Sequence, residues 1–338
     1  MDRLRRSMLQ LLIGAGSSIA LPELSDTWER LAYALHNPYR IDETAMTKME
    51  QLTNLYWELY RGAIAKIDLL SGLQGHLSTV AKLLHVSQPT PLLHRLAKVA
   101  SNTAQIIGEI YLDTEDTEQA VKYYQFAIEA AKEANNPTLQ ALALGRKGFV
   151  FMHAGLPQQA LPLLREAYTQ AEGGKATGKS LGWIVMMEAE ALSSLRSAET
   201  LVAIEKTETV LSQENSGEDT KWTGFNSAAL SAYKGACLLR IHQPEQARHL
   251  LFRALQDLPP GPTRRESLIL ADISKSFILQ GEIEEACKQA TQSLSCAARA
   301  KSIRALQEVR AVQKQLAPWK RQPEVKHLTE QLKSVKFA

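Results

Sequence analysis

The 338-residue sequence is poor in aromatic residues, in cysteines and in long hydrophobic runs. Aromatic side chains make up 6% of the chain, and the three cysteines, Cys237, Cys287 and Cys296, show no CxxC spacing. So small and odd a number argues against a disulfide framework and predicts free, largely buried thiols in a reducing cytoplasm. No apolar stretch approaches the roughly 20 residues that a transmembrane helix needs, so we expect no membrane partner.

The chain also lacks a strong charge of either sign. It contains 39 Lys and Arg against 36 Asp and Glu, a formal net charge of +3. This near-neutral balance offers no electrostatic reason for direct binding to nucleic acid. Long alternating runs of β-branched residues are absent as well, whereas Ala and Leu are abundant. The sequence therefore predicts an all-α protein.

Motifs for catalysis are missing too. The sequence has no HExxH, no GxSxG and no paired His and Cys at metal-ligand spacing, and its eight histidines are scattered. Acidic groups such as Glu282, Glu284 and Glu285 sit where a helix is expected to begin, a position that favours acidic residues without any catalytic role. We expect a protein that is not an enzyme and that uses no cofactor and no metal.

What the chain does contain is a five-position pattern that recurs four times. The copies are counted from Ser101, Ala141, Ala228 and Ser267. Relative positions 8, 20 and 27 are small, and positions 11 and 24 are larger in all but the fourth copy, which has Ala290 at position 24. The four copies are Gly108, Tyr111, Ala120, Tyr124 and Ala127; Gly148, Phe151, Ala160, Leu164 and Ala167; Gly235, Leu238, Ala247, Leu251 and Ala254; and Ser274, Phe277, Ala286, Ala290 and Ser293. The fourth copy is the weakest, because its two serines preserve only the small size.

This spacing resembles the tetratricopeptide repeat. Small residues at positions 8 and 20 let the two helices of a hairpin approach closely, the larger ones fill the remaining space, and position 27 lets the next hairpin dock. The resemblance implies an α-solenoid of about five helical hairpins. One of them, counted from Ile184, is degenerate, since it keeps Ala191 and Ala203 but has Ser194 and Thr207 at the bulky positions.

The expected organisation has four parts. Residues 1–22 form a basic and apolar N-terminal segment, and 23–90 form an N-terminal helical region in which Asp42 caps a helix that carries Tyr56 and Trp57. Residues 91–300 hold the repeats, the third of them degenerate. Residues 301–338 form C-terminal helices that cap the apolar end of the stack.

The order of these parts is similar to the tetratricopeptide sensor region of bacterial helix-turn-helix transcriptional regulators, including the peptide-pheromone receptors. The similarity rests on the Arg- and Leu-rich opening, the Tyr-Trp helix and a stack that begins near residue 90. It implies a non-enzymatic regulatory or sensor module that binds a peptide or protein segment in a concave groove. The solenoid ends and the N-terminal apolar segment are candidate homodimer surfaces.

In such proteins the first helix of each hairpin lines the groove. Carried over to this chain, the candidate ligand contacts are Asn102, Gln105, Glu109, Asp113, Phe149, His153, Arg240 and Lys275. Amide side chains can hydrogen-bond an extended peptide backbone, and the two cations suit carboxylates.

Three further patterns point elsewhere. Residues 173–180 satisfy the P-loop formula GxxxxGK[ST], so Lys179 and Ser180 would hold a nucleotide, although a helix rather than a strand is expected before them. Arg5-Arg6 and the apolar run after it resemble a twin-arginine export signal, which would make this an exported repeat protein. Residues 80–90 resemble a helix-turn-helix but lack clustered basic residues.

Overall fold

The computed structural model describes residues 41–335, apart from 63, 86–88, 175, 177, 213–224 and 259–262. The segment 1–22 and its twin-arginine pattern lie outside these residues. Every regular element in the described part is helical: fourteen α-helices and two short 3-10 helices. The predicted all-α class is therefore confirmed for this part of the chain.

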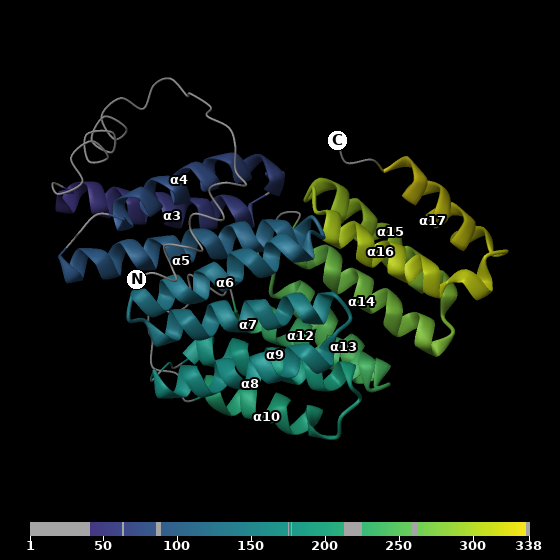
Figure 1. Ribbon diagram of the computed structural model, residues 1–338. Coiled ribbons are helices and arrows are strands. Elements are labelled where there is room, and N and C mark those ends of the chain that lie inside the picture. Colours follow the sequence, from purple (N-terminus) through teal and green to yellow (C-terminus); the bar gives the residue numbers. More distant parts are fainter. Residues whose placement is uncertain are drawn as a thin grey trace.

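The helices follow one another with short connections (Figure 1). The N-terminal half contains α3 (Glu43–Arg61), η2 (Lys66–Leu69), α4 (Leu70–Leu84), α5 (Thr90–Asp113), α6 (Thr117–Glu133), α7 (Pro137–His153) and α8 (Pro157–Gly173). The C-terminal half contains α9 (Gly178–Ser194), α10 (Glu199–Ser212), α12 (Ser227–Arg240), α13 (Pro244–Gln256), α14 (Arg264–Gln280), α15 (Ile283–Arg299), α16 (Ile303–Gln315), η3 (Ala317–Trp319) and α17 (Pro323–Ser334).

Local chemistry explains where many of these helices begin. Asp42 accepts a hydrogen bond from the backbone N–H of Ala45 at 2.7 Å, which confirms the expected cap. Asp116, Asn136 and Asn226 cap α6, α7 and α12 in the same way. Proline stands in the first turn of α5, α7, α8, α13 and α17, where its missing N–H costs nothing.

One kind of turn, with a residue of positive φ just before its donor, recurs at the ends of seven helices in the described part of the chain. A backbone N–H there donates to the carbonyl five residues earlier, as from Asp116 to Tyr111 at 2.9 Å and from Gln243 to Leu238 at 2.9 Å. The residue before each of these donors has a positive φ, and the seven are Glu115, Asn135, Gly155, Arg196, His242, Gly281 and Lys301. Only two of them are glycine, so close helix packing imposes the left-handed conformation at the other five.

Consecutive helices pack against one another, and the first helices of successive hairpins form an inner row. In that row α5 packs on α7, α7 on α9, α9 on α12, α12 on α14 and α14 on α16. Helices α6, α8, α10, α13 and α15 each cover the row from outside. This consecutive packing is that of an α-solenoid.

Glycine permits the closest approach within a hairpin. A Cβ placed on Gly108 would lie 2.9 Å from Cζ of Tyr124, and one on Gly235 would lie 2.6 Å from Cγ of Leu251. The small residue at position 8 therefore lets the helices approach closely, as the spacing predicts, and the structure adds that it faces the larger residue at position 24.

The fourth copy replaces this contact with hydrogen bonds. The Ser274 hydroxyl donates to the Ala286 carbonyl at 2.7 Å, while Ser267 and Ser293 each donate to the other's carbonyl at 2.8 and 2.7 Å. Ser101 makes the matching bond to the Ala127 carbonyl in the first copy, at 2.8 Å. The serines that look like a weakening of the pattern therefore join α14 to α15.

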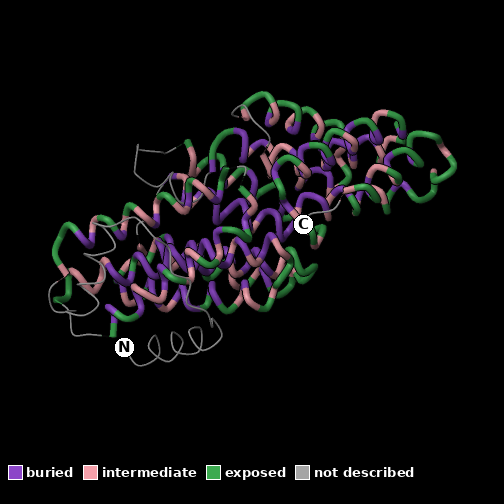
Figure 2. Tube along the Cα trace, turned by 90° about the horizontal axis from the view of Figure 1, so that it is seen from above, coloured by how far each residue is buried: buried purple, intermediate pink, exposed green. Residues whose placement is uncertain are grey.

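The buried residues run along the interior of the helix stack, with exposed residues at its outer edges (Figure 2). They form two hydrophobic clusters, one from Met46 to Cys237 and one from Leu238 to Leu332, so the core divides within α12. All three cysteines are buried free thiols, as expected. Burial raises the pKa of the Cys237 thiol to about 12, which makes it a poor nucleophile at neutral pH.

Candidate binding face

The inner row of helices is closed by polar contacts between its two ends. Nη1 of Arg264, on α14, lies 2.7 Å from Oη of Tyr60 on α3 and 3.1 Å from Oδ1 of Asp113 on α5. The Ser302 hydroxyl, at the start of α16, donates to the same Asp113 oxygen at 2.8 Å. Helix α16 also packs on α5. The last helices thus return to the first ones, and the inner face lies inside a closed superhelix.

Asp113 is the centre of this closure. Its side chain is only 2% exposed, whereas that of Arg264 is 24% exposed. A buried carboxylate is costly unless donors satisfy it, and Arg264 and Ser302 supply two. Burial also raises the pKa of Tyr60, so its hydroxyl stays protonated and can donate to Glu109 Oε2 at 3.1 Å. The closure is therefore satisfied without any added group.

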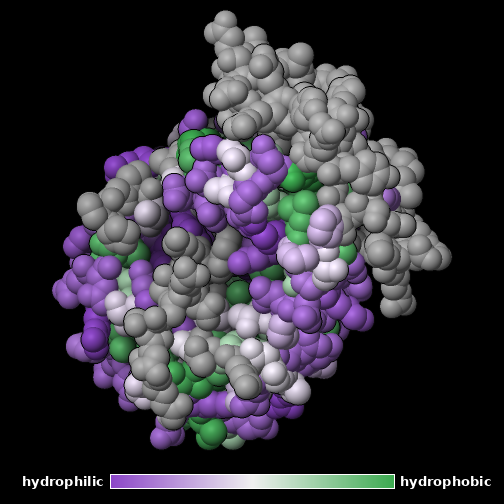
Figure 3. All heavy atoms as spheres, turned by 90° about the vertical axis from the view of Figure 1, so that its left-hand side faces the viewer, coloured by the Kyte–Doolittle hydropathy of each residue, from purple (hydrophilic) through white to green (hydrophobic). Residues whose placement is uncertain are grey.

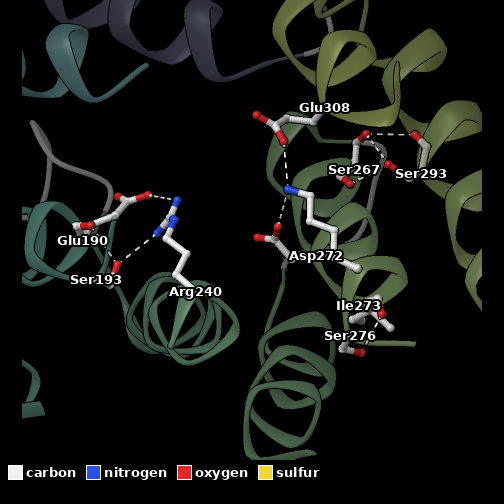
Figure 4. A network of polar contacts seen from close by, with 10 residues as sticks. Glu190, Ser193, Arg240, Ser267, Asp272, Ile273, Ser276, Ser293 and Glu308 are labelled. Atoms are coloured by element: carbon white, nitrogen blue, oxygen red, sulfur yellow. Dashed lines mark hydrogen bonds and ion pairs between the residues drawn. The ribbon is translucent and has the colours of Figure 1, made fainter. Parts of the chain in front are cut away.

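A second set of ion pairs lies further along the inner row (Figure 4). Nη2 of Arg240, on α12, lies 2.9 Å from Oε1 of Glu190 on α9. Nζ of Lys275, on α14, lies 2.9 Å from Asp272 and 2.9 Å from Glu308 on α16. Both cations join neighbouring inner helices, and the exposed fractions of their side chains are 37% and 22%.

The side chain of Arg146 fills the interior between α5 and α7. Its Nη1 donates to Gln105 Oε1 at 2.6 Å, and its Nε lies 3.5 Å from Glu109 Oε1. The guanidinium carbon stands 4.7 Å from the ring centroid of Trp57 and 5.9 Å from that of Trp183. Trp57 is buried. This cluster is packed too tightly to be an open binding site.

All eight predicted contact residues lie on inner helices, but their surroundings differ. Asn102, Gln105 and Asp113 are buried on α5, and Gln105 and Asp113 are held by other side chains. The amide oxygen of Asn102 is buried without a hydrogen-bond partner among the described residues. A ligand would reach these three residues only if the helices packed around them move apart.

Of the other predicted residues, Phe149 is buried, and Glu109, Arg240 and Lys275 are half-buried. His153 is exposed, and its ring packs edge-on against Phe149 with centroids 4.5 Å apart. The pKa of His153 is held well below its usual value. The first cause is the loss of hydration of its ring within the surrounding protein, and the second is the positive charge of Arg304, Arg240 and Arg264. The structure thus brings His153 into the same charged region as Arg240.

Sequence reasoning missed Arg264 and Arg304. Both occupy the first turn of a helix, α14 and α16, where the helix dipole favours acidic groups over cations. A basic residue at such a position is a signal that another element supplies its anion, and Asp113 does so for Arg264. That signal was readable in the sequence, although the partner was not.

The P-loop look-alike connects two helices. Gly173 ends α8, Gly174 follows it, and α9 begins at Gly178, so no strand precedes the loop in its described residues. Ser180 is fully buried within α9. A phosphate or Mg²⁺ could not reach its hydroxyl in this arrangement.

Two other absences concern the described part of the chain. It contains no group of three or more His, Cys, Asp or Glu side chains placed to hold a metal ion. Nor does it contain a helix that combines the length and the apolar character needed to cross a bilayer. At the end of the molecule that carries α3 and α5, the described surface is mostly hydrophilic and is hollowed between the helix ends (Figure 3).

Comparison with known proteins gives one informative likeness. No protein-family model and no curated protein matches this chain. Among solved structures, the chain is similar to a Rap protein complexed with competence and sporulation factor, with a TM-score of 0.53 and 11% sequence identity. The match covers 90% of this chain and 97% of the other. At this identity the likeness speaks for the fold, a TPR-like stack of helical repeats.

Proposed function

We propose that this protein is a non-enzymatic scaffold that binds an extended peptide or protein segment on its inner face. The observation that carries the proposal is the closed inner row itself. Charged side chains from α9, α12, α14 and α16 gather there and keep partial contact with solvent. A surface that is enclosed, polar and still reachable by water suits a ligand with its own donors and acceptors.

A peptide meets these requirements better than a small apolar molecule does. Its backbone offers alternating N–H and C=O groups, which carboxylates, amides and guanidinium groups of the inner helices can satisfy. The Rap protein that shares this fold was solved with competence and sporulation factor bound, which agrees with a binding role for such a stack. The inner positions on α5, α7, α12 and α14 remain our candidate contacts.

We further propose that binding regulates the molecule through the closure. Asn102, Gln105 and Asp113 become available only when α5 moves away from its present partners. A ligand that prefers the opened form would therefore shift the population between closed and opened superhelices. The consequence for a partner protein would follow from that change in shape.

The test uses the full chain and a displayed library of random octapeptides. Enriched peptides are synthesised, and their binding is measured by calorimetry together with hydrogen exchange of the protein. We expect saturable binding and altered exchange on α5, α7, α12 and α14. Binding that alters exchange only on the outer helices α6, α8, α13 and α15, or a library that yields no binder, would overturn the proposal.

A further inference from the structure

Arg304 is a cation without an ion-pair partner within the described part of the chain. It lies in the first turn of α16, half-buried, and its Nε is buried without a hydrogen-bond acceptor. Its guanidinium carbon stands 5.0 Å from the ring centroid of Phe149 on α7. Arg304 therefore points across the inner face toward α7.

The carboxylates of this region are already committed to other cations. Glu308 lies one turn further along the same helix, yet it pairs with Lys275 at 2.9 Å. Glu190 pairs with Arg240 at 2.9 Å, and Asp113 with Arg264 at 3.1 Å. None of these acids forms an ion pair or a hydrogen bond with Arg304, and Glu308 acts on it only through space.

An arrangement of this kind is unfavourable for the isolated protein. A guanidinium group that has lost part of its water and gained no acceptor pays a desolvation cost. The dipole of α16 adds to this cost, because the positive end of the helix lies beside the cation. Cap formation does not require the arginine either, since Ser302 caps the helix by accepting from the Ala305 N–H at 3.2 Å.

The surroundings of Arg304 suit a planar anion. Phe149, which is buried, packs against one side of the guanidinium group and restricts its orientation, as aromatic rings do for arginine. A planar carboxylate matches the guanidinium fork with two parallel hydrogen bonds. Arg240, Arg264 and Lys275 already have acidic partners, so an added carboxylate would find its free donor at Arg304.

We propose that Arg304 binds a single carboxylate of the segment held on the inner face, with Phe149 restricting the orientation of the guanidinium group. The proposal rests on the proposed function for the identity of the ligand as a peptide. The carboxylate belongs either to the C-terminus of that peptide or to an Asp or Glu side chain. Arg240 and Lys275, the cations chosen from the sequence, act mainly between inner helices.

The first experiment examines the anion site without any selected peptide. Full-length protein labelled with ¹⁵N-arginine is titrated with N-acetylglycine, which carries a terminal carboxylate, and with N-acetylaspartate α-amide, which carries only a side-chain carboxylate. The Nε–Hε signal of Arg304 is assigned from the Arg304→Lys variant. We expect it to shift saturably with at least one probe and to stay in place with N-acetylglycinamide, which has no charge.

A matched variant controls for unspecific attraction of anions. Arg310 lies on the same helix as Arg304 but is exposed. The Arg310→Gln protein should keep the full response of the Arg304 signal. An Arg304 signal that stays in place with both carboxylates, or that moves equally with the uncharged amide, would overturn the proposal.

The second experiment uses the octapeptides selected for the proposed function. Arg304→Gln should weaken their binding on the order of ten- to a hundredfold, the range for one charged hydrogen-bonded contact, whereas Arg310→Gln should leave it unchanged. Amidation of the C-terminus should cause a similar loss if that carboxylate is the one bound, and Asp or Glu replacement should do so otherwise. Circular dichroism melts show whether Arg304→Gln is as well folded as the wild type. Arg304→Lys, which keeps the positive charge, provides a second variant in case Arg304→Gln does not fold.

The two proposals fail in different ways. Peptides that bind the inner face but ignore both Arg304→Gln and the removal of their carboxylates would end the anion-site proposal and leave the scaffold function standing. If Arg304 responds to the small carboxylates but no peptide binds, the anion site stands and the scaffold function fails.

Discussion

A buried histidine illustrates how single residues tie the first helices together. His76 on α4 is 3% exposed, and its Nε2 lies 2.9 Å from the hydroxyl of Thr53 on α3. The Thr53 hydroxyl also donates to the Met49 carbonyl at 3.1 Å, so it accepts from the imidazole N–H. Burial lowers the pKa of His76 to about 4. The folded state therefore holds this side chain neutral.

This burial predicts a loss of stability in mild acid. The pKa of His76 falls from about 6.5 in the unfolded chain to about 4 in the folded one, so the unfolded state binds the proton first as pH falls. The stability that depends on neutral His76 is fully present above pH 6.5 and is lost between pH 6.5 and about 4. The loss is on the order of 3 kcal/mol in the free energy of unfolding. Urea unfolding at several pH values measures it.

The variant His76→Gln should flatten this part of the pH profile. The exposed His249 on α13 provides the matched control, because His249→Gln should retain the wild-type slope. Parallel profiles for the His76 variant and the wild type would show that this histidine is not the group responsible.

At the scale of the element, the hairpin is the unit that the sequence pattern encodes. Each contact of the five-position pattern joins two adjacent helices, as Gly235 on α12 and Leu251 on α13 do. Periodicity in the sequence reports such neighbours directly, which is why these contacts were predictable. The left-handed turn at Glu115 was not, because glutamate carries no preference for positive φ.

Close approach at Gly235 predicts opposite effects for two glycine substitutions. Gly235→Ala places a methyl group 2.6 Å from Leu251 Cγ and 3.2 Å from the Ala247 carbonyl, so we expect a loss of about 1–3 kcal/mol in the free energy of unfolding. Gly75→Ala, in the exposed face of α4, meets nothing within 4 Å. It should instead add about 0.5–1 kcal/mol through helix propensity.

Denaturant unfolding of both variants distinguishes packing from propensity. The Gly235 result would contradict this account if the alanine variant were as stable as the wild type, since α12 and α13 would then have room to spare.

At the scale of the whole molecule, the superhelix closes on itself. Arg264 and Asp113 are 151 residues apart, and Ser302 and Asp113 are 189 apart, yet both pairs are in hydrogen-bond contact. The contacts join α14 and α16 to α5, so the inner row of helices closes into a ring. Repeats that touch only their neighbours do not by themselves produce such a ring.

Removal of the closing cation should open the ring. Arg264→Gln leaves the Asp113 carboxylate with Ser302 but without its ion-pair partner, and we expect the free energy of unfolding to fall by about 2 kcal/mol. This figure lies below the usual cost for a fully buried pair, because Arg264 is partly exposed. The distance between spin labels at the exposed Glu58 and Arg310 should lengthen or broaden.

The exposed pair of Lys122 and Glu118 on α6 supplies the control. Lys122→Gln should change neither the label distance nor the stability beyond a few tenths of a kcal/mol. An unchanged distance in the Arg264 variant would mean that apolar packing of α16 on α5 holds the ends together without the ion pair.

The sequence by itself determined the helical class, the hairpins and the close approach of their helices at the small positions 8 and 20, because these depend on residues close together along the chain. It also indicated which helices form the inner row, through the resemblance to tetratricopeptide repeats. Only the tertiary structure decided which cations on that row have partners. Small rotations between successive hairpins accumulate until α16 meets α5, and no local pattern states their sum. That sum pairs Arg264 with Asp113 and leaves Arg304 facing Phe149 without an anion.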